Sequence, residues 1–244
     1  MKAHPNNRAR GKVSMTAVGL LAGYVILLLT ALRETPGIQV SGASSNPPAR
    51  LDEIISRLQV KYSRVRSLAA DFIQMYRAPG VRMRREEGRV ILARGRKMRW
   101  HYTNPEEKFF ISDGHTVYLY VPRERYVTKA RITEHQDIKA SFAFFLGDLN
   151  LRKMFALIEW AESEPPLDPG DLVLRFIPRN PRLGVAEVIV EVAPETLELR
   201  RLSLREFDGA RSDFFFSNVR ENIAVSRSTF LFAIPPGVQV VEAR

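Results

Sequence analysis

Residues 100–114, WHYTNPEEKFFISDG, decide the fold of this chain. An aromatic strand ends at a turn marked by proline, a second apolar strand follows, and Asp113-Gly114 is typical of a hairpin turn. Because both central positions of a type I′ turn need positive φ, which Asp and Gly tolerate, we predict such a turn here and another at Asp208-Gly209. The stretch therefore predicts antiparallel strands that follow one another along the chain.

Short runs of β-branched, aromatic and aliphatic residues, separated by turn residues, continue on both sides of this stretch. The eleven strands predicted from them cover residues 68–75, 88–93, 97–103, 108–112, 116–121, 126–130, 171–177, 186–192, 197–207, 213–219 and 228–234. A series of this kind indicates a mainly β fold built as a barrel or a strongly curved sheet.

Two segments are predicted to be helical. In the first, apolar residues recur every three or four positions, which places one apolar stripe on about four turns: Leu51, Ile54, Ile55, Leu58, Tyr62 and Val65. The second, residues 138–158, carries clustered aromatic and aliphatic residues that include Phe142 and Phe145, and we interpret it as one or two short helices interrupted at Gly147.

The N-terminus predicts export. Residues 1–33 contain five basic residues and no acidic one, and their apolar run at 15–32 lies between a signal-peptide core and a membrane-spanning helix in length. We therefore interpret residues 1–33 as a signal peptide or an N-terminal membrane anchor, 34–50 as a flexible linker rich in Pro, Gly and Ser, and 51–244 as the exported domain.

Composition excludes several classes of protein. The chain has 244 residues, of which 45% are hydrophobic, so it can bury a sizeable core. Its net charge of +10 falls to +5 without the leader (32 basic minus 27 acidic residues), and a solvated basic surface explains that excess better than nucleic-acid binding. The absence of cysteine excludes disulfides, thiol catalysis and a lipid-modified N-terminal Cys.

Candidate catalytic residues are few, and we predict no catalytic site, no metal site and no cofactor. The four histidines show no metal-ligand spacing, and His115 follows a hairpin turn where a solvated position is typical. The carboxylate pairs Glu86-Glu87 and Glu106-Glu107 flank turns, where exposed charge is the simpler explanation. An enzyme is the minority interpretation.

Four segments in order resemble the LolA-type outer-membrane lipoprotein carriers. The Trp strand, proline and SDG turn of residues 100–114, followed by TVYLYV at 116–121, resemble the centre of that family's pattern. LAADFIQ at 68–74, Glu87-Gly88, and FLFAIPPGVQVV at 230–241 resemble its flanking segments.

The resemblance implies an incomplete antiparallel β-barrel of about eleven strands with an α-helical lid. It also implies a monomeric periplasmic carrier, either free or tethered to the inner membrane by an uncleaved leader. The carrier would take acylated lipoproteins from an inner-membrane ABC transporter to an outer-membrane receptor, if one exists. Arg94 matches the arginine that latches the lid helices in that family, although Gly95 stands where the family usually has Pro, and Arg96 and Arg99 lie nearby.

The residues suited to line an acyl cavity are the apolar ones on the predicted strands and helices: Leu58, Phe72, Met98, Trp100, Tyr102, Phe110, Phe142 and Phe145. For each residue taken alone, ordinary core packing is the simpler explanation. Two other functions stay open, an RseB-like sensor with the same fold that regulates signalling and an envelope-anchored enzyme.

Overall fold

The computed structural model describes residues 48–132, 150–181 and 184–242. In chain order, its elements are α1 (Pro48–Arg64), β1 (Ser67–Ala78), β2 (Val81–Ala93), β3 (Lys97–Asn104), β4 (Lys108–Asp113), β5 (Thr116–Val121), β6 (Tyr126–Arg131), α2 (Leu151–Met154), β7 (Phe155–Trp160), β8 (Leu172–Pro178), β9 (Val185–Val192), β10 (Leu199–Glu206), β11 (Arg211–Glu221), the 3₁₀ turn η4 (Arg227–Phe230) and β12 (Gln239–Glu242).

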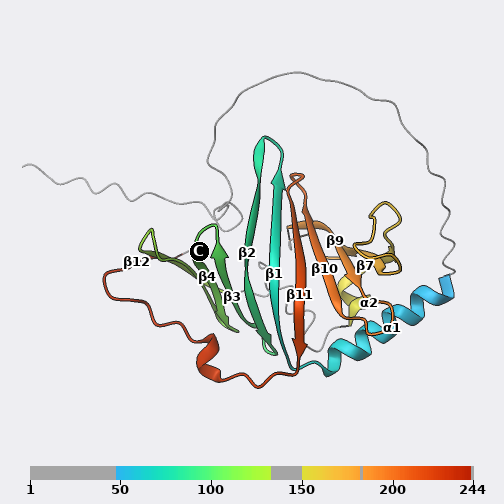
Figure 1. Cartoon of the computed structure of the whole chain (residues 1–244), viewed down its shortest axis with the longest axis horizontal. Coiled ribbons are helices and arrows are strands. Elements are labelled where there is room, and N and C mark those ends of the chain that lie inside the picture. Colours follow the sequence, from blue (N-terminus) through green and yellow to red (C-terminus); the bar gives the residue numbers. More distant parts are fainter. Residues whose placement is uncertain (1–47, 133–149, 182–183, 243–244) are drawn as a thin grey trace, which may run out of the picture.

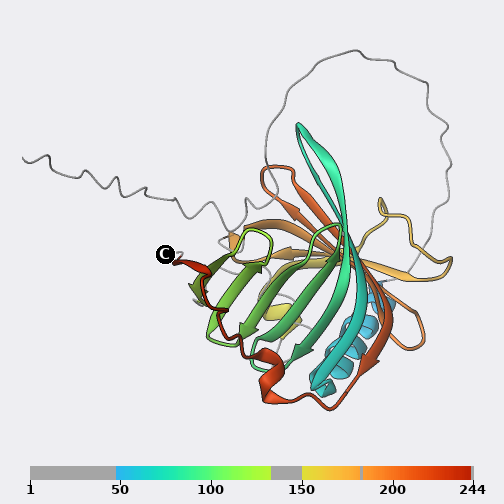
Figure 2. The same cartoon turned by 60° about the vertical axis from the view of Figure 1, so that its left-hand side comes forward.

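The twelve strands form one sheet in the order β12-β6-β5-β4-β3-β2-β1-β11-β10-β9-β8-β7. Two meanders, β1 to β6 and β7 to β11, are joined where β1 pairs antiparallel with β11, and only β12 pairs in parallel, with β6. The sheet curves strongly, and helix α1 lies inside the curve (Figure 1, Figure 2). The predicted mainly β, incompletely closed architecture is confirmed.

The concave face of the sheet and the apolar stripe of α1 share one core. Alternate residues of each strand point inward, as the two-residue period of a strand requires. Three residues from the two halves of the sheet are each at most 2% exposed: Trp100 on β3, Phe176 on β8 and Leu202 on β10. They belong to the same apolar cluster as Ile54 and Leu58 of the helix. Helix and sheet therefore bury their apolar faces against each other.

The C-terminal segment covers part of the convex face. Arg99 of β3 donates from Nη1 to the carbonyl of Thr229 at 3.3 Å, and the ring of Phe232 lies 5.3 Å and 5.4 Å from those of Tyr118 and Tyr120. Phe230 is buried at 3% exposure. The predicted strand at 228–234 is therefore wrong: these residues form η4 and an extended cover, because their aromatic side chains pack down onto β3 to β5 instead of pairing along an edge.

Two other expectations need correction. Residues 155–158, predicted to continue a helix, belong to strand β7, which pairs with β8; residues 138–149 of that predicted segment lie outside the described residues. At both predicted hairpin turns φ is positive at Gly114 and Gly209 but not at the preceding Asp, so neither is type I′. Asp113 instead accepts hydrogen bonds from the backbone N–H groups of His115 and Thr116, both at 2.8 Å.

Helix α1 begins at Pro48, so its first turn includes the last residues of the predicted linker. The leader lies outside the described residues. In the part of the chain that the structure describes, no helix is both long and apolar enough to cross a membrane.

Candidate functional site

The concave face is the candidate site, and its centre is aromatic. Phe72 of β1 makes edge-to-face contacts with Trp100 and Tyr102 of β3, each with ring centroids 4.9 Å apart. Phe214 of β11 approaches Trp100 at 5.4 Å. Because β1 stands between β2 and β11, these rings bridge the two meanders at the point where they join.

All described candidates for the acyl cavity lie in this one cluster. Their exposed fractions are between 1% and 5%: Leu58, Phe72, Met98, Trp100, Tyr102 and Phe110. Phe142 and Phe145 lie outside the described residues. The structure therefore brings six of the eight candidates together on one apolar surface between sheet and helix.

A polar group interrupts this apolar surface toward one end. The hydroxyl of Tyr102 donates to Oε1 of Gln74 at 2.8 Å, and burial raises the pKa of Tyr102, as does the nearby Glu86 carboxylate. Lys108 lies over the Tyr102 ring at 4.2 Å and pairs with Glu86 at 2.6 Å. Tyr102 therefore stays neutral at physiological pH and offers one satisfied polar contact inside the curve of the sheet.

Arg94 fastens the C-terminal end of α1 to the loop between β2 and β3. Its Nη2 donates to the carbonyl of Ser63, and its Nε donates to the carbonyl of Val65 at 3.2 Å. Both acceptors lie at the helix end, where carbonyls lack intrahelical partners and the helix dipole favours a cation. One guanidinium thus serves two orphan carbonyls at once.

The other arginines near Arg94 are placed differently. Arg99 points to the convex face, where it contacts Thr229 and lies 5.4 Å from the ring centre of Phe109. Arg96 adopts a left-handed backbone conformation with φ 58° and accepts a hydrogen bond from Ser112 through its carbonyl. Of the three arginines, Arg94 is the one that contacts α1 within the described residues.

The C-terminal half of α1 is held by the turn between β9 and β10. The Tyr62 hydroxyl donates to the carbonyl of Leu197 at 2.9 Å, Lys61 donates to that of Thr196 at 2.9 Å, and Arg57 donates to that of Glu195 at 3.2 Å. Sequence reasoning missed these contacts. Only the basic residues at three- to four-residue spacing beside the apolar stripe could have suggested them.

Two residues of α1, Asp52 near its start and Gln59 past its middle, contact α2. The backbone N–H of Leu151 donates to Oε1 of Gln59 at 3.1 Å, and Arg152 pairs with Asp52 at 2.6 Å. Helix α1 is therefore tied to the rest of the chain at three places by polar contacts, most of them to backbone carbonyls. Such contacts are individually weak, and each can exchange with water.

The carboxylate pairs considered as catalytic candidates take part in ion pairs, of which the Glu86–Lys108 pair is largely buried. His101 lies 3.0 Å from Glu107 and stacks on Phe109 at 4.3 Å. Glu86 pairs with Lys108, Glu87 with Arg85 and Glu106 with Arg123. Within the described ranges, no group of three or more His, Asp or Glu side chains is arranged to hold a metal ion.

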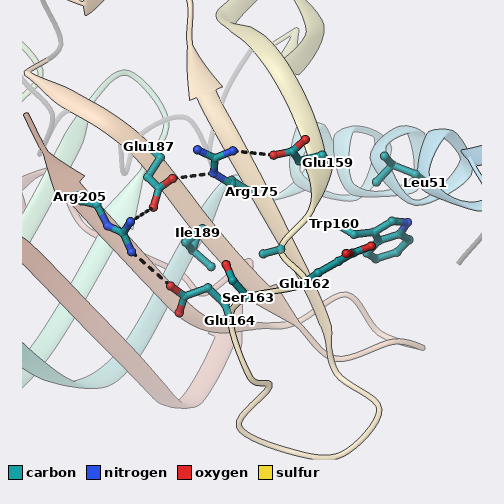
Figure 3. Close-up of a pocket in the computed structure, with 11 residues that line it drawn as sticks. Leu51, Glu159, Trp160, Glu162, Ser163, Glu164, Arg175, Glu187, Ile189 and Arg205 are labelled. Atoms are coloured by element: carbon teal, nitrogen blue, oxygen red, sulfur yellow. Dashed lines mark hydrogen bonds and ion pairs between the residues drawn. The ribbon is translucent and has the colours of Figure 1, made fainter. Parts of the chain in front are cut away.

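A separate pocket of about 590 Å³ lies on the convex face, beside β7 to β10 (Figure 3). A chain of ion pairs crosses it, in which Arg175 bridges Glu159 and Glu187 at 2.6 Å each, and Arg205 bridges Glu187 and Glu164 at 3.0 Å and 3.5 Å. Since its lining is mainly charged and mutually paired, this pocket does not suit an apolar ligand.

Comparison with known proteins finds similarity to outer-membrane lipoprotein carrier proteins. The family model described as outer membrane lipoprotein carrier protein LolA matches residues 63–233. An outer-membrane lipoprotein carrier protein of Methylococcus capsulatus is 28% identical over 189 residues, which cover 77% of this chain and 86% of that protein.

Two solved structures are similar at lower identity. A LolA superfamily protein from Nitrosomonas europaea is 10% identical, with a TM-score of 0.42 over 75% of this chain and 97% of that one. MucB, in the Pseudomonas aeruginosa MucA/MucB complex, is 12% identical, with a TM-score of 0.40 over 75% of this chain and 61% of that one.

Proposed function

Because the chain belongs to the outer membrane lipoprotein carrier protein LolA family, we propose that it is a periplasmic carrier that binds the acyl chains of lipoproteins between its concave face and helix α1. The observation that carries the proposal is the single apolar surface inside the curved sheet, covered by a helix whose own apolar stripe faces it. Cargo would enter when α1 moves away and exposes that surface.

The energetics make such a carrier necessary. Burying an acyl chain of about 14 methylenes is worth on the order of 11 kcal/mol at about 0.8 kcal/mol per CH₂, so a free lipoprotein aggregates or returns to its first membrane. A carrier must nevertheless release its cargo. We propose that closing the helix over the empty face competes with cargo, and that the polar contacts of α1 set this balance.

Arg94 is the proposed latch. Its guanidinium donates to two carbonyls at the end of α1, so these side-chain hydrogen bonds would stabilise the closed arrangement and be lost when the helix leaves. Of the proposed cavity residues, Leu58 lies on the helix that moves and Phe72, Met98, Trp100, Tyr102 and Phe110 lie on the sheet that stays. Phe142 and Phe145 stay candidates from sequence alone.

The proposed partners follow from the same route. Cargo is an acylated lipoprotein, loaded by an inner-membrane ABC transporter and passed to an outer-membrane receptor or to the membrane itself. The leader would place the domain in the periplasm, either freed by cleavage or tethered to the inner membrane. A reporter fused after Arg244 should be active only outside the cytoplasm, and activity only inside it would contradict export.

Displacement of an apolar fluorophore tests the carrier itself. The exported protein should bind the fluorophore with enhanced emission, and triacylated peptide should displace it while the unacylated peptide should not. Mass spectrometry of protein purified from the envelope should find bound lipid or lipoprotein. If acylated peptide does not displace the fluorophore, the carrier proposal is contradicted.

A regulatory sensor with the same fold predicts a different outcome. It would bind acylated ligand without handing it on, and its output would be a contact with a membrane-bound signalling protein. Transfer of bound lipoprotein to acceptor membranes, measured after adding outer-membrane vesicles, separates the two functions, because only a carrier passes its cargo on.

A further inference from the structure

Two hairpin ends meet at the same end of the sheet. The β1–β2 hairpin projects beyond its neighbours, and the β10–β11 turn lies beside it (Figure 1). A Cβ atom at Gly209 would lie 3.5 Å from Cγ of Pro79, so the two turns are in contact. We define the tip as residues 77–85 and 206–210.

The tip exposes two large apolar side chains. Met83 is 54% exposed and Phe207 is 64% exposed, although the core of the same sheet buries residues of this kind almost completely. Each is contributed by a different hairpin. Two exposed apolar groups on adjoining turns are more informative than single ones scattered over a surface.

The tip is also cationic. Residues 77–85, RAPGVRMRR, contain four arginines and no acid, and the adjoining turn adds two acids, Glu206 and Asp208, which leaves +4 − 2 = +2. Arg77 and Arg85 pair with Asp213 and Glu87 but are half exposed, at 54% and 50% of their side chains. Their guanidinium groups therefore remain within reach of further anions.

We infer that the tip docks on bilayer surfaces that carry anionic lipid headgroups. Two apolar side chains on projecting turns offer too little area for a stable protein interface, which buries about 800 Å² on each partner. A bilayer requires no matching shape: Met83 and Phe207 insert between headgroups, while the surrounding arginines contact phosphates and keep their apolar stems along the acyl boundary.

This inference goes beyond the proposed function, because docking requires neither cargo nor an open helix. It assigns the carrier an orientation at the membrane: the β1–β2 hairpin faces the lipid, and the turn that holds α1, at the other end of β9 and β10, faces away. The two ideas therefore fail separately, one in acyl displacement and the other in vesicle binding.

Fluorophores attached at single cysteines test the inference, since the chain has no cysteine of its own. The exported protein as purified carries a polarity-sensitive fluorophore after Met83→Cys, Phe207→Cys or, as a control at the opposite end, Glu195→Cys. With phosphatidylglycerol-containing vesicles, the first two should shift to the blue and the third should not. With phosphatidylcholine vesicles none should shift. The leader is basic too, so the control at Glu195, rather than the dependence on lipid charge, separates docking by the tip from attachment through a retained leader.

Matched variants then measure how much the arginine charge and the two apolar side chains each contribute to vesicle binding. Arg82→Ser should weaken binding to anionic vesicles about five-fold, as expected for one cation near a charged surface, whereas Arg66→Ser, which removes the same charge at the other end of β1, should not change it. Met83→Ser with Phe207→Ser should weaken binding on the order of ten-fold. Equal shifts at all three cysteines, no shift at either tip site, or equal effects of Arg82→Ser and Arg66→Ser would each overturn the inference.

Discussion

Arg94 combines three properties at the scale of one residue: a position after β2, a planar fork of donors, and two carbonyl acceptors at the end of α1. The acceptors lie at the end of the helix, where carbonyls lack partners within the helix itself. A latch of this kind works only on the closed arrangement. If Arg94 is the proposed latch, its removal should shift the equilibrium of helix α1 towards the open arrangement without altering the apolar surface beneath.

Arg94→Leu should therefore tighten the binding of acylated cargo about ten-fold, the effect of about 1.4 kcal/mol, and slow its transfer to acceptor membranes. Lys at this position should restore little, because an ammonium lacks the fork that spans both carbonyls. Arg96→Leu and Arg99→Leu are the matched controls. If either of these blocks transfer while Arg94→Leu transfers normally, another arginine holds the helix.

Gly88 explains the Glu87-Gly88 pair of the sequence in physical terms. A Cβ atom there would lie 2.0 Å from the carbonyl oxygen of His101 and 2.8 Å from Cα of Tyr102, both backbone atoms of β3. The register between β2 and β3 also shifts at this point. The position therefore demands a residue without a side chain so that the two strands can approach closely.

Gly88→Ala should lower the free energy of unfolding by about 1–3 kcal/mol or more, because backbone atoms must move to admit the methyl group. Urea denaturation followed by tryptophan fluorescence measures the change. Arg89→Ala, in the next position and exposed, should alter it by less than about 0.5 kcal/mol. Equal midpoints for Gly88→Ala and the parent would show that β2 and β3 separate without cost.

At the scale of the element, α1 is the part of the fold that combines an apolar face with replaceable polar ties. Arg57 and Lys61 donate to carbonyls of the β9–β10 turn, and Lys61 also pairs with Glu221 at 2.8 Å. The sheet strands, in contrast, are joined along their whole length. Helix α1 is therefore expected to open before the sheet does.

Arg57→Ala combined with Lys61→Ala should raise the hydrogen-exchange rates of α1 amides about ten-fold or more while β1 and β11 exchange at the parent rate. The control is Glu53→Ala, on an exposed position of the same helix. Faster exchange throughout β1 and β11 in the double variant would mean that helix and sheet open as one unit.

At the scale of the whole molecule, the convex face carries buried charge that couples stability to pH. Burial by itself raises the pKa of Asp213, but hydrogen bonds from Ser203, Arg211 and Arg77 outweigh it and hold that pKa below its usual value of 3.8. The hydrogen bonds from Arg211 likewise lower the pKa of Glu164. Both carboxylates therefore stabilise the fold when ionised.

Because these folded-state pKa values lie below the unfolded ones, the stabilisation is present above about pH 4 and is lost as the pH falls through the folded values. Burial raises the pKa of Glu191 above its value in the unfolded chain. Ionisation of Glu191 therefore destabilises the fold as the pH rises, which is opposite to the effect of Asp213 and Glu164. Urea midpoints between pH 7 and pH 2 should fall in the acid range, and less steeply for Asp213→Asn. An unchanged slope in that variant would assign the acid transition to other groups.

The sequence by itself determined most strands and the face of α1 that is buried. Apolar residues recur every two positions in a strand and every three to four in a helix, and this local pattern shows which side of each element is turned away from water. It also singled out Arg94 through resemblance, although the role of Arg94 still rests on the transfer experiment. Six of the predicted cavity residues lie together in the core, while their division between packing and cargo was not decided by their pattern and stays a prediction.

Only the tertiary structure decided the elements whose partners are distant in sequence. Residues 155–158 become strand β7 because β8 offers them a free edge, and residues 228–234 become a cover because Tyr118 and Tyr120 present an apolar surface to Phe232. Arg94, Arg57 and Lys61 donate to backbone carbonyls that no sequence pattern could have identified. Every residue has a carbonyl, and only the fold determines which carbonyls come within hydrogen-bonding distance.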